Sequence, residues 1–316
     1  MLSAINPSSA IVLIASSVAV LLASSGEGGA RPLSLGVMAA TVTVDCSTGA
    51  KLQTAINAAV AGDIIVVQGV CVENISVPDE AVRITIDGQG SGTIRAASAA
   101  AATVTVLGRS ITIKRLIITG GRQGIIVLRG GSALIDGNTI HQAVGQGVLI
   151  IQNGHARIVS NTIQLNGLSG IGVGEGSIAR IGFLDNAGPV LANLIQGNGA
   201  EGVAIVRGSS ATVLGNYISE NNGPGVLVSG TSHGLLAGNH IDANIGDGVA
   251  VTQNSDVQLG DEGGIFDPLN ETSVPNGGAG LRCSLNGSVS GGLGTLTGVE
   301  GQKKFDSSCA SGPKIK

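Results

Sequence analysis

The sequence predicts an all-β solenoid in which short strands stack coil on coil. Two regularities support this fold class. A glycine followed by alternating apolar residues recurs at intervals of 23 or 32 residues, and an Asn-x-Ile motif recurs in step with it. Fixed intervals of this length are typical of solenoids, whose repeats pack only against their neighbours. The glycines are Gly124, Gly147, Gly170, Gly202, Gly225, Gly248 and Gly280, and the asparagines are Asn138, Asn161, Asn193, Asn216 and Asn239.

Each repeat holds three short β-like runs and no helical stretch. The third run is again β-like, as at residues 133–135, 156–158 and 211–213. Leucine-rich repeats fit less well, because they need regularly spaced leucines and a helical or 3₁₀ return. We therefore expect about nine coils of roughly 23 residues, with equivalent strands paired in parallel.

Alternation within the runs predicts which side chains form the core. The first and third residues after the repeat glycine are β-branched in four coils, so we place them inside. A small residue precedes each motif asparagine, as a tight corner requires. We expect the asparagine amides to stack along the rod and bond the corner backbone, which is a structural role. The motif isoleucines form a second inward column: Ile140, Ile163, Ile195, Ile218 and Ile241.

The N-terminal 40 residues are predicted to be an export signal and leader. Residues 10–23 are apolar but short for a membrane span, and small and Gly-rich sequence follows them. No Lys or Arg precedes this stretch, so an uncleaved membrane anchor stays open as an alternative. Cleavage after Ala23 and cleavage as late as Ala39 are both compatible with the sequence.

The remaining chain divides into a cap, a solenoid and a tail. We expect residues 41–62 to form a strand and a capping helix, because Leu52, Ile56 and Val60 share one helical face. Strands then begin at Ile64, and the coils occupy residues 63–287. Residues 288–316 lack the repeat and are predicted to form a loose C-terminal cap or tail.

The four cysteines fall as two outlying pairs, one near each end of the solenoid. Three pairings are formally possible. A rod of about nine coils at ~4.8 Å each is too long to be cross-linked end to end, so proximity favours Cys46–Cys71 and Cys283–Cys309. The spacing carries no zinc signature. Disulfides favour an exported protein.

The chain resembles bacterial secreted proteins of the pectin-lyase-like superfamily, with repeats of the carbohydrate-binding and sugar-hydrolysis type. The motifs are the entry at residues 52–56 and 62–67 and the Asn-Thr-Ile and Gly-Val-x-Val coils, over residues 46 to about 285. The resemblance implies a single-stranded right-handed parallel β-helix, a polysaccharide partner, and a secreted, periplasmic or cell-surface location. One scaffold hosts many chemistries, so the motifs specify activity weakly.

Activity motifs of the superfamily are altered in this chain. Asn138-Thr139 and Asn161-Thr162 resemble the start of the polygalacturonase Asn-Thr-Asp motif, but Ile140 and Ile163 replace the acid. Asp267-Pro268 resembles the Asp-Pro-His of alginate epimerases, with Leu269 in the place of the histidine. These departures favour binding over catalysis.

The two 32-residue intervals each contain nine inserted residues, which predict two loops on the same edge of the rod. The loops begin at Gly182 and Gly260 and lie three coils apart, about 14 Å at strand spacing. Between them the register places Tyr217 beside His240 and Ser219 beside Asp242. The candidate catalytic residues are Tyr217, His240 and Asp242, and the candidate substrate-binding residues are Phe183, Asp185, Ser219, Phe266 and Asp267. The alternative is that these are solvated surface residues and that the loops only cover apolar strand edge.

Charge divides along the rod. Residues 95–157 hold seven basic residues and one acid, whereas residues 170–280 hold eleven acids against Arg180 and Arg207. A polyanionic glycan would prefer the first half. No cofactor is expected, with one exception. The loop acids Asp185, Asp261, Glu262 and Asp267 could supply oxygen ligands to Ca²⁺. The net charge of −4 argues against nucleic acid.

In the run that follows the repeat glycine, the outward positions of several coils are apolar, which is unfavourable for a surface in water. The segment Thr41–Val44, a protein partner or self-association would cover them. The positions are Ile126, Leu128, Leu149, Ile151, Ala204, Val206, Leu227 and Ala250.

Together these features predict an exported β-helix that binds extracellular or cell-surface polysaccharide without catalysis. The alternative is a polysaccharide lyase acting on uronate-containing glycan at Tyr217 and His240. A second alternative is a structural surface scaffold.

Overall fold

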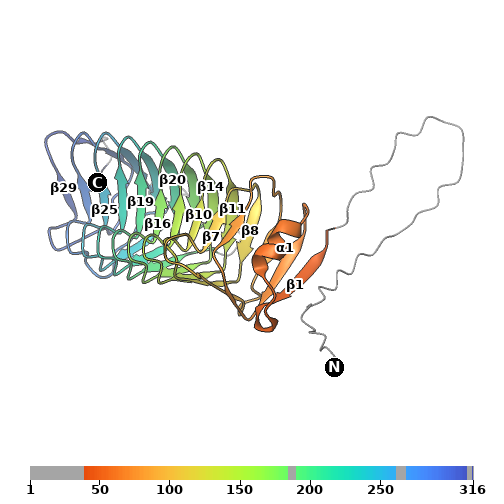
Figure 1. Ribbon diagram of the computed structural model, residues 1–316. Coiled ribbons are helices and arrows are strands. Elements are labelled where there is room, and N and C mark those ends of the chain that lie inside the picture. Colours follow the sequence, from red (N-terminus) through yellow and green to blue (C-terminus); the bar gives the residue numbers. More distant parts are fainter. Residues whose placement is uncertain (1–38, 184–189, 261–267, 312–314, 316) are drawn as a thin grey trace, which may run out of the picture.

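The computed structural model describes residues 39–183, 190–260, 268–311 and 315. The chain winds into a rod of about eleven turns (Figure 1). This exceeds the nine predicted coils, because the chain beyond residue 287 still adds strands β28, β29 and β30 to the sheets.

Three parallel sheets make up the rod, and each complete coil adds one strand to each sheet in turn, although the eight-stranded sheet ends at β24 while the other two continue. The twelve-stranded sheet comprises β1 (Thr41–Asp45), β2 (Ile64–Gln68), β5 (Thr85–Asp87), β8 (Ile111–Lys114), β11 (Ser132–Asp136), β14 (His155–Val159), β17 (Ile178–Ile181), β20 (Ser210–Leu214), β23 (His233–Ala237), β26 (Asp256–Leu259), β28 (Ser288–Ser290) and β30 (Ala310–Ser311). The eight-stranded sheet comprises β3 (Val70–Val72), β6 (Thr93–Arg95), β9 (Ile117–Thr119), β12 (Thr139–His141), β15 (Thr162–Gln164), β18 (Leu194–Gln196), β21 (Tyr217–Ser219) and β24 (His240–Asp242). The ten-stranded sheet comprises β4 (Ile75–Val77), β7 (Val104–Val106), β10 (Ile125–Val127), β13 (Val148–Ile150), β16 (Ile171–Val173), β19 (Val203–Val206), β22 (Val226–Ser229), β25 (Val249–Val251), β27 (Leu281–Cys283) and β29 (Lys303–Phe305).

The core consists of files of β-branched side chains, one residue per coil. Equivalent residues of successive coils pair in register, as Ile140 does with Ile163 and Val148 with Ile171. The five motif isoleucines are fully buried, and so are the predicted inward residues of the Gly-Val-x-Val coils. Each inward methyl group therefore packs on a similar one in the next coil, which explains why the repeats conserve shape as well as polarity.

The corner between the twelve- and eight-stranded sheets contains the stacked asparagines. Asn216 is fully buried, and its Nδ2 donates to Asn239 Oδ1 (3.0 Å) and to the carbonyl of Ile181 (2.9 Å). Its Oδ1 accepts from the backbone N–H and the Nδ2 of Asn193. The ladder extends beyond the predicted members to Asn270, since Asn239 donates to its Oδ1. Each amide thus satisfies backbone groups that water cannot reach.

Two further polar ladders line the other corners. The corner after the eight-stranded sheet holds a second asparagine ladder, and the corner before the twelve-stranded sheet holds serines whose hydroxyls accept backbone N–H groups. Left-handed backbone at Gly215 and Gly238 makes the first corner tight enough to place the asparagine inside. The second ladder is Asn166, Asn198, Asn221, Asn244 and Asn276, and the serines are Ser177, Ser209, Ser232 and Ser255.

A helix closes the N-terminal end, as predicted. The helix α1 (Leu52–Ala58) buries Leu52 and Ile56 against the first coil, after a 3₁₀ turn η1 (Cys46–Thr48). The carboxylate of Glu73 accepts from the N–H groups of Leu52 and Gln53 and so caps the helix. Val60 lies past the helix end and is 43 % exposed, so its predicted place on the buried face is wrong. No helix of the described residues has the length and apolar character to span a bilayer.

Both predicted disulfides are present, one at each end of the rod. Cys46 in η1 bonds Cys71 in β3, and Cys283 in β27 bonds Cys309 just before β30. The second bridge ties back a segment that continues the sheets, because β28, β29 and β30 all pair in parallel with the preceding coil. The coils therefore extend past residue 287.

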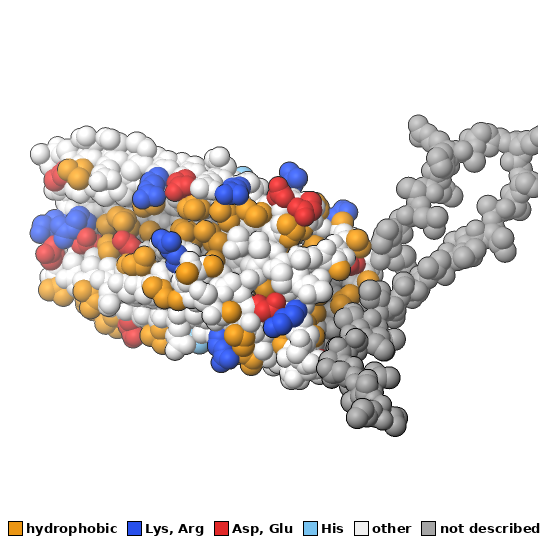
Figure 2. All heavy atoms as spheres, viewed as in Figure 1, with side chains coloured by type: hydrophobic (Ala, Val, Ile, Leu, Met, Phe, Trp, Pro, Cys, Tyr) orange, Lys and Arg blue, Asp and Glu red, His pale blue; other side chains and the backbone are white. Residues whose placement is uncertain are grey.

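The predicted apolar strip lies on the outer face of the ten-stranded sheet. Figure 2 shows it as a band of apolar side chains along the rod, with charged side chains beside it. Register places Ile126 beside Leu149, and Ala204 beside Leu227. The segment Thr41–Asp45 does not cover this band, because it pairs with β2 at the end of the twelve-stranded sheet. That part of the prediction is wrong.

We predict that Asn216→Ala destabilises the rod by about 2–4 kcal/mol, because the buried backbone N–H of Asn193 loses its acceptor and the buried carbonyl of Ile181 loses a donor. Urea unfolding followed by circular dichroism would measure this. Asn222→Ala is the matched control, since Asn222 is exposed in the same coil. Equal midpoints for the two variants would contradict the structural role of the ladder.

Candidate functional site

The outer face of the eight-stranded sheet brings Tyr217 and His240 together. Parallel pairing of β21 with β24 puts Tyr217 opposite His240 and Ser219 opposite Asp242. The Tyr and His rings stack with centroids 5.0 Å apart and planes 14° from parallel. Tyr217 is 51 % exposed. Each ring shields one face of the other, so the pair presents its remaining faces, its edges and its polar atoms to solvent.

Polar side chains continue this face toward the N-terminal end. Register aligns Ser219 with Gln196 and Gln164, and the Gln196 amide donates to Gln164 Oε1 (3.0 Å). Hydroxyl and amide groups of this kind both donate and accept hydrogen bonds. The face therefore offers neutral hydrogen-bonding groups at every strand spacing.

The carboxylate of Asp242 is hydrogen-bonded to the backbone. Its Oδ1 accepts from the N–H groups of Ser273 (2.6 Å) and Val274 (3.2 Å). This fixes the chain that follows Glu271, whose own carboxylate lies 3.7 Å from His240 Nδ1. Sequence reasoning placed Asp242 correctly beside Ser219 but did not foresee these bonds, because residues 273 and 274 follow the second loop and fall outside the repeat.

The predicted loop residues do not all join this face. Phe183 follows β17 at the corner and packs on the twelve-stranded side, with its ring centroid 4.9 Å from the Arg157 guanidinium and 5.9 Å from that of Arg180. These contacts place Phe183 on a different sheet from Tyr217 and His240, beside which it was predicted to bind substrate. A phenylalanine ring is attracted to guanidinium groups, which accounts for its position. Asp185, Phe266 and Asp267, like the Ca²⁺ candidates Asp261 and Glu262, lie outside the described residues.

A second cluster lies on the twelve-stranded sheet. Arg157 of β14 and Arg180 of β17 are opposite each other in register, and His155 lies opposite Ile178 two residues earlier. Between these two files is a hollow of about 320 Å³ that also reaches Ser132. The pairing of the two arginines could have been predicted from the sequence, since Ala-Arg-Ile occurs at 156–158 and again, one repeat later, at 179–181.

Several other charged groups are engaged in structural pairs. Burial opposes ionisation of Asp87, yet hydrogen bonding to Arg115 and proximity to Lys114 outweigh it and lower the pKa of that carboxyl. Asp247 and Glu300 hydrogen-bond Arg282 and raise the pKa of its guanidinium. These contacts secure the coils and leave little capacity for ligands.

Comparison with known proteins agrees with the fold. The family model for the periplasmic copper-binding protein NosD matches residues 112–259, less than half of the chain. No curated protein sequence matches this chain. Pectate lyase Pel9A has a TM-score of 0.56 at 13 % identity, over 88 % of this chain and 83 % of that one. The chain has the pectin-lyase-like β-helix fold. At this identity the likeness concerns the fold alone.

Two further structures share this β-helix. A double mutant of the periplasmic alginate epimerase AlgG has a TM-score of 0.52 at 15 % identity, over 86 % of this chain and 72 % of that one. The enzymatically active domain of tailspike protein 2 of bacteriophage CBA120 has a TM-score of 0.61 at 13 % identity, over 82 % of this chain. This chain spans only 44 % of that tailspike domain.

The described residues do not fit a copper site. Copper favours histidine nitrogen and cysteine or methionine sulfur. Both methionines, Met1 and Met38, lie outside the described residues. Within the described part, the one group of three potential metal ligands is Cys46, Cys71 and Glu73, and its sulfurs are joined in a disulfide. No step of copper chemistry is therefore assigned to this β-helix.

We predict that Asp242→Ala increases hydrogen exchange at the amides of Ser273 and Val274 about tenfold, equivalent to about 1.4 kcal/mol, because both lose their acceptor. Exchange resolved by NMR or mass spectrometry would measure it. Asp256→Ala, which removes an exposed carboxylate bonded to His233, serves as the control. Unchanged exchange at both amides would contradict the structural role of Asp242.

Proposed function

We propose that this protein is an exported β-helix that binds polysaccharide along the outer face of the eight-stranded sheet, without cleaving it. The observation that carries the proposal is the exposed Tyr217–His240 stack beside the file of hydroxyl and amide groups formed by Ser219, Gln196 and Gln164. These groups repeat at the ~4.8 Å strand spacing. A sugar chain lying along the rod would meet hydrogen-bonding groups at each coil.

Charge on this face favours a neutral glycan. In register, Tyr217 and His240 are flanked by Leu194 on one side and Glu271 on the other. Asp242 adds a second carboxylate. A polyanionic chain would be repelled by these acids, whereas neutral hydroxyl groups can donate to them.

Binding is favoured over catalysis by the engagement of Asp242. Its Oδ1 already accepts from two backbone N–H groups, so this oxygen is occupied by a structural contact. β-Elimination also requires the uronate carboxylate to be neutralised, and the register positions beside Tyr217 and His240 hold no Arg or Lys. These facts support a binding role at this face.

A polysaccharide lyase is the second candidate. The fold likeness to a pectate lyase and the pairing of a tyrosine with a histidine, both able to transfer protons, favour it. Under this alternative His240 would act as the proton acceptor, with Glu271 positioning its ring.

Export to an oxidising compartment is supported by the two disulfides. The NosD family, which matches the central coils, is described as periplasmic. The export signal within residues 1–40 stays a prediction, because residues 1–38 lie outside the described part of the chain.

We predict that Tyr217→Ala and His240→Ala each weaken retention on neutral polysaccharides about 5- to 10-fold, since each removes about 1 kcal/mol of ring and hydrogen-bond contact. Affinity electrophoresis through gels containing defined polysaccharides would measure it. Gln258→Ala is the control, because Gln258 is exposed on the twelve-stranded sheet.

The same preparations distinguish the second candidate. Incubation with uronate polysaccharides, with and without Ca²⁺, is followed by the absorbance of the unsaturated product. The proposal expects no product. Product that disappears in His240→Ala would establish the lyase instead. Absence of both retention and product would leave the scaffold role.

A further inference from the structure

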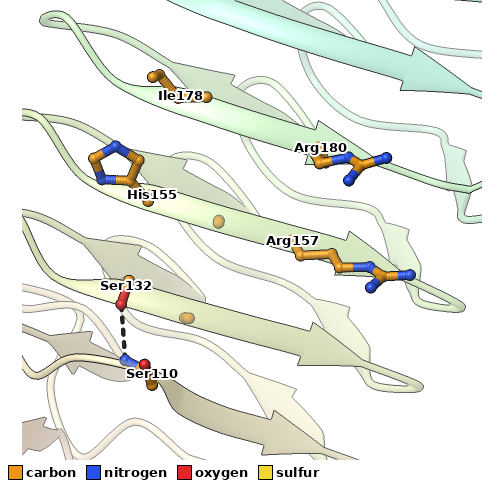
Figure 3. Close-up of a pocket in the computed structure, with 8 residues that line it drawn as sticks. Ser110, Ser132, His155, Arg157, Ile178 and Arg180 are labelled. Atoms are coloured by element: carbon orange, nitrogen blue, oxygen red, sulfur yellow. Dashed lines mark hydrogen bonds between the residues drawn. The ribbon is translucent and has the colours of Figure 1, made fainter. Parts of the chain in front are cut away.

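Arg157 and Arg180 form a pair of like charges in register on the twelve-stranded sheet. Both side chains are exposed, and Figure 3 shows them at the same end of neighbouring strands, extending in the same direction. Both guanidinium groups lie within 6 Å of the Phe183 ring centroid, at 4.9 and 5.9 Å. Like charges directly opposite each other on a sheet repel, so an anion bound between them would stabilise the pair.

The same chain shows how it compensates an equivalent pair elsewhere. On the ten-stranded sheet Arg282 is in register with Lys304. The carboxylate of Glu300 lies between them, 2.5 Å from Arg282 Nη2 and 3.0 Å from Lys304 Nζ. Those two cations lower the pKa of Glu300, Arg282 having the larger effect. At Arg157 and Arg180 no described residue supplies the equivalent carboxylate.

A hollow adjoins the arginine pair. It has a volume of about 320 Å³ and lies between the arginines and a second file formed by His155 and Ile178 (Figure 3). Ser110 and Ser132 lie at its N-terminal end, where the Ser110 N–H donates to Ser132 Oγ (2.7 Å). The hollow is shallow and open to solvent, and its lining is mainly apolar, so it offers contact to one face of a ring-sized molecule beside the arginines.

We propose that Arg157 and Arg180 form a binding site for a compact organic anion, whose carboxylate or sulfate group takes the place that Glu300 has beside Arg282. The two guanidinium groups donate to the oxygen atoms of the anion, which is the geometry that arginine favours. Phe183 holds the guanidinium groups in place through contact with its ring. The body of the ligand occupies the hollow toward His155.

This site is independent of the proposed polysaccharide face, which belongs to a different sheet and carries acidic groups. A failure of either proposal therefore leaves the other standing. One rival lies within the chain itself. Asp185 follows Phe183 by two residues and lies outside the described residues, so its carboxylate is tested directly as a competitor.

The test is titration of the full-length protein with sodium glucuronate, glucose 6-sulfate and glucose, followed by NMR or calorimetry. We expect both anions or one of them to bind and glucose not to bind. The comparison of glucuronate with the sulfate distinguishes the two anion types. Binding should weaken at least tenfold in Arg157→Gln and Arg180→Gln and fall as NaCl is raised.

Matched variants complete the experiment. Arg207→Gln removes an exposed arginine paired with Glu175 and should bind as the unaltered protein does. Arg157→Lys/Arg180→Lys keeps the charge but loses the planar donor groups, and should weaken binding less than the glutamine variants. Circular dichroism verifies that each variant is folded.

Three results would overturn the proposal. The first is equal binding of glucose and the anions. The second is binding that persists in the double glutamine variant. The third is binding that appears only in Asp185→Asn, because Asp185 would then be the natural partner of the two arginines.

Discussion

The rod depends on the hydrogen bonds that its buried corner side chains make to the coil above and below. A three-sided coil turns the backbone three times, and each turn leaves N–H and C=O groups inside the rod, away from water. Two asparagine ladders and one serine ladder satisfy these groups. Because each side chain bonds its equivalent in the next coil, the ladders also fix the register. A shift by one residue would turn the inward isoleucines to the outer face and take the asparagines out of the corner.

Fixed register makes the outer surface a set of files in which one residue per coil is free to vary. Neighbours on the surface are therefore residues 23 or 32 positions apart, such as Tyr217 and His240 or Arg157 and Arg180. The interior requires side chains of similar shape in every coil, whereas the outer positions accept many kinds of side chain. Chemical groups can consequently gather on separate faces, and the three sheets differ in character. The eight-stranded sheet carries hydroxyl and amide groups with acids at one end, the twelve-stranded sheet carries the arginine pair, and the ten-stranded sheet carries the apolar band.

Much of this arrangement was predictable from the sequence because the period is visible in it. The inward isoleucines, the first asparagine ladder and the Tyr217–His240 pairing all follow from counting residues in register, and both disulfides follow from the proximity of each cysteine pair at one end of the rod. The second ladder, with Asn166 and Asn198, carries the same intervals and was open to the same reasoning. What the sequence could not predict depends on chain that departs from the period. Phe183 turns onto Arg157 and Arg180, and the segment after Glu271 returns to Asp242, because inserted residues have no register to define their direction.

The choice between binding and catalysis depends on how free the polar groups are to change their charge. A catalytic group must gain or lose a proton during the reaction, so it needs a position where both forms are tolerated. The Asp242 carboxylate accepts two backbone N–H groups, and the Tyr217 and His240 rings stack against each other. These contacts order the face. A rigid face that repeats at strand spacing costs little conformational entropy when a sugar chain is bound, since its side chains are already ordered by their neighbours along the file.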